Sequence, residues 1–487
     1  MQVIARHNEV RLLKKFLHSN KPEFMAVYGR RRVGKTFLIK NFFLKENKLF
    51  FHVTGVENSD YLTQRTNFCR RLSEVFYDGI PLHVPKNWYS VFELLKNTTD
   101  KLPNNKKIIL FFDEFPWMIT ARAKLLETLE YYWNEYWGND ARIKLIICGS
   151  TASWIIRNII NNTGGLFQRV TYRLKIEPFK LGQARLFLKE KGIRLTKQQV
   201  TLLYMVVGGI PLYLEQAKKG LTADQIIDQL CFNKNGILFD ELKELFKSLF
   251  KNEHIYLKIV KEIAKHRHGI SKDDLARYLK LSRGGRLSHR LTELEDTGFI
   301  VSFIPYQNKE RGEFFKIIDE YTMFYFNWIA PNLRAIRNFD QPMGIWLDKT
   351  KQGIYYAWKG AVFESICYKH VPEIMQKLQL RTSSIPYSWR TSAKSAGKKY
   401  GAQIDLLFER PDDAITLCEI KYTEKPFVID KVYAHSLENK RTIFIEQTKI
   451  KQQVFMALIS ANGLKASKYS KQLIDQVVTL EDLYVDA

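Results

Sequence analysis

The sequence feature that most restricts the fold is a short basic loop, GRRRVGKT, at residues 29–36. Apolar runs at 24–28 and 37–39 flank it, so we expect a strand, the loop and then a helix. Gly29 and Gly34 lack a Cβ atom, which lets backbone N–H groups turn around phosphate oxygens. The helix adds the positive end of its dipole there. This order predicts a nucleotide phosphate site, whereas the alternative is a basic surface turn.

The side chains of this loop have distinct expected roles. Lys35 can reach the β- and γ-phosphates of a nucleotide, and the hydroxyl of Thr36 can hold Mg²⁺. The expected nucleotide-binding set is the whole loop: Gly29, Arg30, Arg31, Arg32, Val33, Gly34, Lys35 and Thr36.

A second apolar run, residues 108–112, ends in two acids, Asp113 and Glu114. A run without polar alternation is typical of a strand buried on both faces of a parallel sheet. Open α/β sheets bind ligands at the carboxyl ends of such strands. We expect Asp113 to hold the Mg²⁺ shell and Glu114 to orient or deprotonate the attacking water. The alternative is a strand that ends at an acidic turn in solvent.

Two further residues belong to this expected catalytic set, each with an equally good structural explanation. Ser150 follows the apolar run 145–148, so its hydroxyl could sense the γ-phosphate or the attacking water, or it could belong to an ordinary helix cap. Arg169 precedes the strand-like residues 170–174 and could touch phosphate from its own chain or a neighbouring one. A plain surface arginine explains that position at least as well.

The composition indicates a basic, multidomain protein. At 487 residues the chain is too long for one core, and 76 Lys and Arg against 51 Asp and Glu give a net charge of +25. Such an excess attracts polyanions, so nucleic acid is the expected partner, DNA before RNA, although a generally lysine-rich proteome could supply much of the charge. A homo-oligomer is a further possibility.

The sequence also predicts a cytoplasmic location without a membrane partner. We find no apolar run of membrane-spanning length, and charge interrupts the first residues too early for a secretory signal. The five cysteines are scattered, without metal or redox spacing, which fits a reducing compartment.

The pattern of elements changes twice before the middle of the chain. Residues 1–180 alternate strands with helices, as doubly wound sheets do, and residues 181–251 are helical. Within the helical part, Gly208 and Gly209 stop one helix and Pro211 starts the next. This break could place Pro211 against an adenine ring, or it could be only a hinge.

Residues 252–335 form the third expected domain, in which three helices and a β-ribbon up to residue 306 predict a winged helix. Its expected recognition helix, about 286–297, has a leucine stripe for the core and a basic outward side, made of Arg283, Arg286, His289 and Arg290. The alternative is a packing module, because fold does not fix function. We interpret His266-Arg267-His268 as a solvated helix end, since no Cys or acid stands at ligand spacing.

Residues 336–487 contain a set of acids and a lysine that is typical of metal-dependent nucleases. Glu364 lies in a predicted helix, and Asp405, Glu419 and Lys421 lie in two predicted strands. Glu419 and Lys421 share a face, and Asp405 would lie beside Glu419 if the strands pair as a hairpin. Mg²⁺ between the carboxylates would activate a water, and Lys421 would position it. The alternative is alternating charge on solvent faces.

The segment from 381 to 400 has no acid and could follow a phosphate backbone. Its basic residues are Arg381, Arg390, Lys394, Lys398 and Lys399. Trp389 and Tyr400 could stack on bases, although core packing is the better explanation for Trp389.

Taken together, these motifs resemble the archaeal-ATPase-like proteins of the STAND branch of AAA+ NTPases, many of which have a C-terminal PD-(D/E)xK restriction-endonuclease-like domain. The resemblance covers nearly the whole chain. The motifs that support it are Arg6-x-x-Glu9, residues 29–36, Phe112-Asp113-Glu114, Gly149-Ser150, residues 208–214, the winged helix, and Asp405 with Glu419-x-Lys421. One departure is Gln168 before Arg169, where the family pattern has glycine.

This resemblance implies ATP binding through Lys35 and Thr36, Mg²⁺ binding through Asp113, and Glu114 as the hydrolytic base. It also implies that Pro211 contacts the nucleotide base. The expected fold is α/β and multidomain: a P-loop NTPase parallel sheet, a helical lid, a winged helix and a restriction-endonuclease-like α/β domain. The expected function is an ATP-hydrolysing switch that binds nucleic acid and has a Mg²⁺-dependent nuclease-like domain. The alternative is a signalling or scaffold ATPase whose C-terminal domain binds a partner without cleavage.

Overall fold

The computed structural model of the chain describes residues 3–46, 49–121, 123–282, 284–308, 312–338, 344–391 and 401–485. They form two compact units: residues 1–178 with 296–298, and residues 179–295 with 299–487. The division into four domains stays a prediction, and each unit is described by itself.

The first unit is built on a parallel sheet with the strand order β2-β3-β4-β1-β5. Its elements, in chain order, are α1 (His7–His18), β1 (Glu23–Tyr28), α2 (Lys35–Lys45), β2 (Leu49–Thr54), α3 (Tyr61–Phe76), α4 (Trp88–Asp100), β3 (Ile108–Asp113), α5 (Phe115–Met118), α6 (Leu125–Glu135), η1 (Trp137–Asn139), β4 (Ile143–Cys148), α7 (Ala152–Ile155), η2 (Ile156–Ile160) and β5 (Tyr172–Lys175). The strands expected at 24–28, 108–112 and 145–148 are therefore present.

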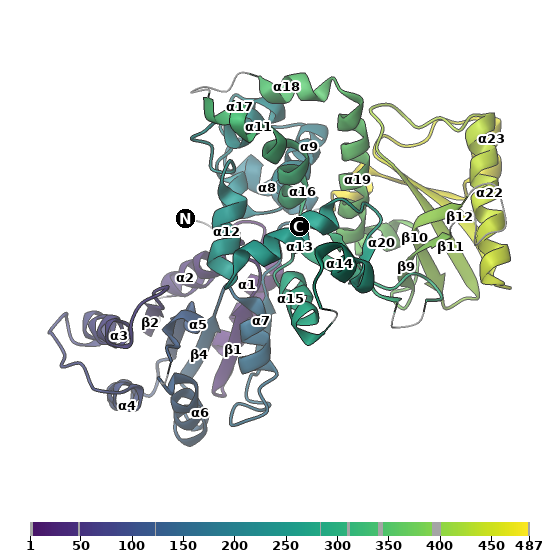
Figure 1. Cartoon of the computed structure of the whole chain (residues 1–487). Helices are drawn as coiled ribbons and strands as arrows, with labels where there is room; N and C mark the ends of the chain where they lie inside the picture. The colour runs from purple at the N-terminus through teal and green to yellow at the C-terminus, as the bar shows by residue number, and fades with distance from the viewer. Residues whose placement is uncertain are drawn as a thin grey trace. The chain divides into compact units, whose positions relative to one another are not determined.

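Helices cover both faces of this sheet, which explains why its strands are continuously apolar. Neighbouring residues of β2 point to opposite faces. Phe50 stacks on Phe43 of α2, with ring centroids 6.0 Å apart, whereas Phe51 packs on Phe68 of α3 at 5.1 Å. All six residues of β3 and of β4 are buried. Figure 1 shows these strands in purple to blue between their helices.

The second unit begins with a helical part, which lies within the range expected to be helical. It contains α8 (Leu181–Glu190), α9 (Lys197–Val207), α10 (Pro211–Leu214), α11 (Ala223–Cys231) and α12 (Glu241–Leu249). Gly208 ends α9 with φ of +61°, and Pro211 is the first residue of α10. The helix-break-helix element is thus where the Gly-Gly-x-Pro pattern predicts it.

The break requires Gly209 for a steric reason. A Cβ atom on Gly209 would lie 1.8 Å from the carbonyl oxygen of Phe179. We expect Gly209→Ala to lower the free energy of unfolding of this unit by at least ~2 kcal/mol, because only backbone atoms surround the new methyl group and they cannot move aside cheaply. Chemical denaturation would measure the loss. The matched control is Gly353→Ala at the start of helix α19, where a Cβ meets nothing within 4 Å and alanine favours the helix. Equal stability of both variants would contradict the steric explanation.

Three helices and a small antiparallel sheet follow, and we call residues 253–317 the α13–β8 module. Its elements are α13 (Glu253–Ala264), β6 (Ile270–Ser271), α14 (Lys272–Leu279), α15 (Gly285–Asp296), β7 (Ile300–Phe303) and β8 (Phe314–Ile317), with the strand order β6-β8-β7. The three helices and β7 lie where the sequence predicts them, whereas β8 lies beyond residue 306, where the predicted ribbon ends. Leu287, Leu291 and Leu294 of α15 are buried, as the predicted core stripe requires.

Helices then lead to a C-terminal mixed sheet with the order β13-β12-β11-β10-β9. The elements are α16 (Glu320–Phe324), η4 (Tyr325–Ile329), η5 (Ala330–Asn332), α17 (Leu333–Asn338), α18 (Ile345–Thr350), α19 (Gly353–Lys369), α20 (Val371–Lys377), β9 (Ile385–Thr391), β10 (Ala402–Arg410), β11 (Ala414–Lys421), α22 (Lys431–Thr448), β12 (Gln453–Ser460), α23 (Lys468–Leu473), β13 (Gln476–Thr479) and α24 (Leu480–Leu483). Strands β9, β10 and β11 pair antiparallel, and β11, β12 and β13 pair parallel. Figure 1 shows α22, in yellow-green, lying along this sheet.

Within the described ranges, every helix is too short or too polar to span a bilayer.

Candidate functional sites

The glycine-bounded loop of the first unit has the backbone geometry that its sequence predicts. Gly29 has φ of +137°, and a Cβ atom there would lie 2.3 Å from the carbonyl oxygen of Ile176. Gly34 has φ of +88° and precedes α2. Lys35 is buried, and its Nζ donates to the carbonyl oxygens of Gly29 (2.9 Å) and Arg30 (3.0 Å). A buried lysine held inside the loop does not fit the alternative of a basic surface turn.

Two arginines, one before the loop and one within it, are placed to support a phosphate site. Arg6 is buried and donates to the carbonyl oxygen of Val33 at 3.1 Å, while its other nitrogen pairs with Glu9 at 2.9 Å. The Arg6-x-x-Glu9 leader therefore supports the loop from outside. Within the loop, Nη1 of Arg31 is buried without a hydrogen-bond partner among the described residues. A buried cationic donor of this kind fits an anionic ligand.

The expected Mg²⁺ ligands lie next to each other. The hydroxyl of Thr36 donates to Oδ2 of Asp113 at 2.8 Å, although 77 residues separate them along the chain. His52 of β2, which the motif search missed, places its Nε2 3.7 Å from the same carboxylate oxygen. Its sequence signal is a single polar residue in the apolar run 49–53.

Glu114 is held by the neighbouring strand. It adopts φ of +45° directly after β3, and Ser150 at the end of β4 donates to its Oε2 through both the backbone N–H (2.8 Å) and the hydroxyl (2.9 Å). The Ser150 side chain thus contacts the acid rather than capping α7. Burial raises the pKa of Glu114, and the charge of Lys35 partly opposes that shift. Lys35, Asp113, Glu114 and Ser150 therefore belong to one site.

The structure does not place two expected site residues, Arg169 and Pro211, in this cluster. Arg169 is exposed on the loop before β5. Gln168 before it has φ of +56°, a conformation that favours glycine and explains why the family pattern has glycine there. Pro211 lies in the second unit, so its contact with a nucleotide base stays a prediction.

The C-terminal hairpin brings the expected nuclease residues together. Strands β10 and β11 pair as an antiparallel hairpin up to Leu406 and Cys418, and Asp405 and Glu419 are the next residues of the two strands. The two acids are close enough for the charge of Glu419 to raise the pKa of Asp405. Lys421 lies on the same face as Glu419, and its Nζ is 2.8 Å from Oε1 of that acid. This pairing meets the condition under which the sequence places the two carboxylates side by side.

Glu419 is almost fully buried and surrounded by donors. Besides Lys421, Lys440 of α22 binds its Oε2 at 2.8 Å, and the hydroxyl of Tyr433 donates to Oε1 at 2.5 Å. Burial alone would raise the pKa of Glu419, but the ammonium groups of Lys440 and Lys421 outweigh it and hold the pKa below its usual range. The sequence gives no local signal for Lys440 or Tyr433.

The other two carboxylates have different partners. Burial raises the pKa of Asp405 to about 6, and the negative charges of Glu364 and Glu419 contribute. Gln403 donates to Oδ1 of Asp405 at 2.9 Å. Glu364 of α19 forms an ion pair with Arg267, so His266-Arg267-His268 is more than a solvated helix end. Among the described residues, no group of three or more His, Cys, Asp or Glu is arranged to hold a metal ion.

The basic segment at 381–400 is described only in part. Arg381 and Arg390 are exposed, whereas Trp389 is buried in the core of the C-terminal sheet, which confirms the packing interpretation. The remaining predicted contacts, Lys394, Lys398, Lys399 and Tyr400, lie outside the described residues, as does Arg283 of the basic face before α15.

The chain is similar to several known proteins. A family model described as an ATPase domain predominantly from Archaea matches residues 4–217. The uncharacterized protein MJECL04 of Methanocaldococcus jannaschii is 28% identical over 438 residues, which span 88% of this chain and 90% of that protein. The uncharacterized ATP-binding protein MJ0423 of the same organism is 47% identical over 45 residues, or 9% of this chain and 73% of that protein.

Two solved structures are also similar. The Walker-type ATPase paby2304 of Pyrococcus abyssi has a TM-score of 0.47 and 18% identity, over 67% of this chain and 96% of that one. The ORC2 protein of Aeropyrum pernix, solved with ADPNP and ADP, has a TM-score of 0.41 and 14% identity, over 72% of this chain and 96% of that one. With the phosphate loop and the acids at the ends of its parallel strands, residues 4–217 are an ATPase domain of the type found predominantly in archaea.

Proposed function

We propose that this chain is a Mg²⁺-dependent ATP-hydrolysing switch of the STAND/AAA+ type that binds nucleic acid, DNA before RNA, and has a PD-(D/E)xK nuclease-like domain. The observation that supports the switch most strongly is the convergence of Lys35, Thr36, Asp113, Glu114 and Ser150 in the ATPase domain. They follow the ends of three neighbouring strands of the sheet: Lys35 and Thr36 come after β1, Asp113 and Glu114 lie at the end of β3, and Ser150 comes after β4.

The residues present fit ATP with Mg²⁺. The Thr36 hydroxyl and the Asp113 carboxylate, 2.8 Å apart, are the oxygen ligands that Mg²⁺ prefers. Bound Mg²⁺ would neutralise charge that develops on the phosphates. Lys35 and the loop N–H groups would bind the phosphate oxygens, and Glu114 would accept the proton of the attacking water. Ser150 orients Glu114 through its two hydrogen bonds.

Nucleic-acid binding is supported by the outward side of α15. Arg286 and His289 are exposed and Arg290 is partly exposed, while the leucines of the same helix face the core. His289 also lies 3.0 Å from Glu293, so the side is not uniformly basic. The net charge of +25 favours a polyanion, and basic residues at the start of a helix suit phosphate and base-edge contact.

The nuclease-like assignment is supported by the β10–β11 hairpin, which brings Asp405 near Glu419, and by Lys421 on the same face as Glu419. Two carboxylates this close favour a divalent cation between them. Asp405 and Glu364 would hold that cation together with Glu419. The cation would activate a water for attack on a phosphodiester, and Lys421 would position it.

One observation favours a second candidate, a signalling or scaffold ATPase whose C-terminal domain binds a partner without cleavage. Lys421, Lys440 and Tyr433 already satisfy Glu419. A carboxylate with three donors and no metal is a stable structural arrangement.

A plasmid assay separates these two functions. We expect the full chain with ATP and Mn²⁺ or Mg²⁺ to nick supercoiled DNA, and Asp405→Asn to lower the rate at least ~100-fold because it removes a charged metal ligand. The matched control is Asp413→Asn in the exposed β10–β11 turn, which should cleave like the wild type. Absence of cleavage by the wild type would favour the scaffold. Equal cleavage by wild type and Asp405→Asn would assign the cutting to a contaminant.

A further inference from the structure

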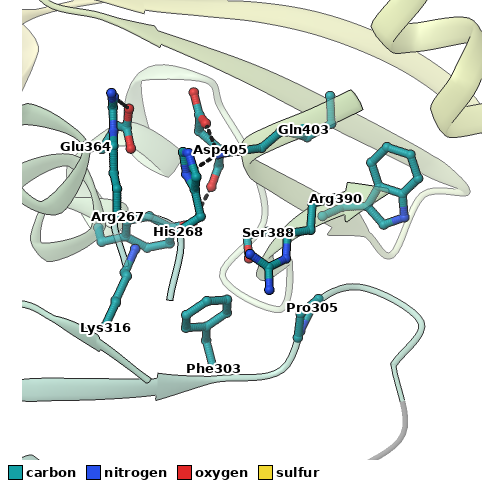
Figure 2. A pocket seen from close by; sticks show the side chains of 13 residues that line it. Arg267, His268, Phe303, Pro305, Lys316, Glu364, Ser388, Arg390, Gln403 and Asp405 are labelled. Atoms are coloured by element: carbon teal, nitrogen blue, oxygen red, sulfur yellow. Dashed lines mark hydrogen bonds and ion pairs between the residues drawn. The ribbon is translucent and has the colours of Figure 1, made fainter. Parts of the chain in front are cut away.

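The α13–β8 module lies directly on the expected nuclease residues of the same unit. The segment that follows α13 provides Arg267 and His268, and β8 provides Lys316. Together with Glu364 and Asp405 they line one small cavity. Figure 2 shows this cavity, with dashed lines from Arg267 to Glu364 and among His268, Gln403 and Asp405.

Residues of the α13–β8 module interact with both carboxylates, Glu364 and Asp405. Arg267 pairs with Glu364 through a charge-assisted hydrogen bond. Gln403, 2.9 Å from Oδ1 of Asp405, also lies 2.8 Å from Nδ1 of His268. The module therefore contacts one acid directly and the other through a single side chain.

Lys316 is a second basic residue that lines this cavity, besides Arg267. Its Nζ lies 3.2 Å from the ring centroid of Tyr368, and the hydroxyl of that tyrosine donates to the carbonyl oxygen of Asp405. Burial lowers the pKa of Lys316 to about 7, an effect that the charges of Glu364 and Asp405 oppose. An ammonium placed here needs those carboxylates as its counter-charges.

The cavity leaves little room between its side chains. Its volume is about 30 Å³, which is room for about two water molecules. Mg²⁺ binds with several of its waters, and the scissile phosphate needs space as well. A cation that enters would also meet the positive charges of Arg267 and Lys316, which line the cavity. The charges of Lys440 and Lys421 act on Asp405 as well. A divalent cation at these acids would therefore compete with positive charges that are already in place.

We propose that the α13–β8 module holds the nuclease-like site closed, with Arg267 neutralising Glu364 in place of a divalent cation. Metal binding and the Arg267–Glu364 pair then exclude each other, and the site accepts metal once Arg267 has left Glu364. This inference rests on the proposed nuclease-like function. Binding of the module to nucleic acid would provide the free energy to open it, since phosphates compete for the same basic side chains.

The test measures Mn²⁺ binding to the full chain by electron paramagnetic resonance, without nucleotide. We expect Arg267→Ala to raise the Mn²⁺ affinity on the order of tenfold, because removing a fixed cation from an acidic site favours a mobile one. Arg267→Gln, which keeps a polar side chain but removes the positive charge, should give the same gain. The gain should disappear in the double variant Arg267→Ala/Asp405→Asn, which locates the bound ion.

The matched control is Arg277→Ala. Arg277 is an exposed arginine of the same module, paired with Asp274 at 2.6 Å on its own helix, and its removal should leave Mn²⁺ affinity unchanged. Unchanged affinity in both Arg267 variants, or a gain that persists in the double variant, would overturn the closed-site proposal. The measurement of Mn²⁺ affinity needs no cleavage. If Arg267→Ala raises that affinity but the chain never cuts DNA, the nuclease function is rejected and the closed-site proposal stands. Cleavage by the wild type, with no effect of Arg267→Ala on affinity or rate, rejects the closed site alone.

Discussion

Glu114→Gln should bind ATP as tightly as the wild type but hydrolyse it ~10²–10³-fold more slowly. Glutamine has the size of glutamate, and its carbonyl oxygen can still accept the two hydrogen bonds from Ser150. It cannot accept a proton from water, so only the step that needs a base is lost. Steady-state phosphate release gives the rate, and equilibrium binding of a fluorescent ATP analogue gives the affinity.

The matched control for this variant is Glu127→Gln on α6. Glu127 is an exposed acid of the same unit, so both the affinity and the rate should stay at the wild-type level. A Glu114→Gln enzyme with undiminished turnover would show that another group activates the water. A loss of ATP binding instead would assign Glu114 to nucleotide binding.

The ATPase site was largely predictable from the sequence because its information is local. Lys35 and Thr36 are the last residues of the loop and the first of α2, and the parallel sheet brings the end of β3 to the same edge. The order of the strands along the chain does not reveal that β4 lies between β1 and β3 in the sheet. Because β4 lies there, Ser150 contacts Glu114, a contact that the sequence alone does not predict. His52 was missed for the same reason, because its contact with Asp113 depends on β2 lying next to β3.

The C-terminal site was predictable only for its hairpin. Antiparallel pairing of two consecutive strands brings Asp405 near Glu419, and a sequence can suggest such a hairpin. Lys440, 21 residues beyond Glu419, is brought close by the packing of α22. Arg267 reaches Glu364 across 97 residues. Side chains that meet through packing between separate elements leave no periodic signal in the sequence, so the charge balance of this site was not foreseen.

The same limit explains the tripeptide His266-Arg267-His268. Helix α13 ends at Ala264, so the three residues lie just beyond a helix end, as the sequence suggests. The partners, Glu364 for Arg267 and Gln403 for His268, lie in the C-terminal part of the unit. His266, by contrast, has a local partner, Glu262, whose Oε1 lies 3.3 Å from its Nε2. The sequence near the tripeptide therefore indicates the helix end but not the distant partners of Arg267 and His268.

Lys35→Ala should lower the affinity for ATP with Mg²⁺ at least ~100-fold and remove detectable hydrolysis. The wild-type ammonium is buried inside the loop, 2.9 Å from the carbonyl oxygen of Gly29, so it is already positioned for phosphate oxygens. A charge-assisted hydrogen bond of this kind contributes about 1.5–3 kcal/mol, and Lys35 can make more than one. Alanine also leaves the carbonyl groups of Gly29 and Arg30 without their donor.

Lys35→Ala also removes the donor for two carbonyl groups of the loop, so the loop could rearrange, and the experiment needs a control for folding. Lys45→Ala removes an exposed lysine from the last turn of the same helix, α2, and should change neither affinity nor turnover. Thermal unfolding without nucleotide should be similar for the two variants, whereas added ATP with Mg²⁺ should raise the melting temperature of Lys45→Ala alone. If ATP stabilises Lys35→Ala as much as it stabilises the control, the loop at 29–36 does not bind the triphosphate. The expected ligands Thr36 and Asp113 would then need another explanation for their contact.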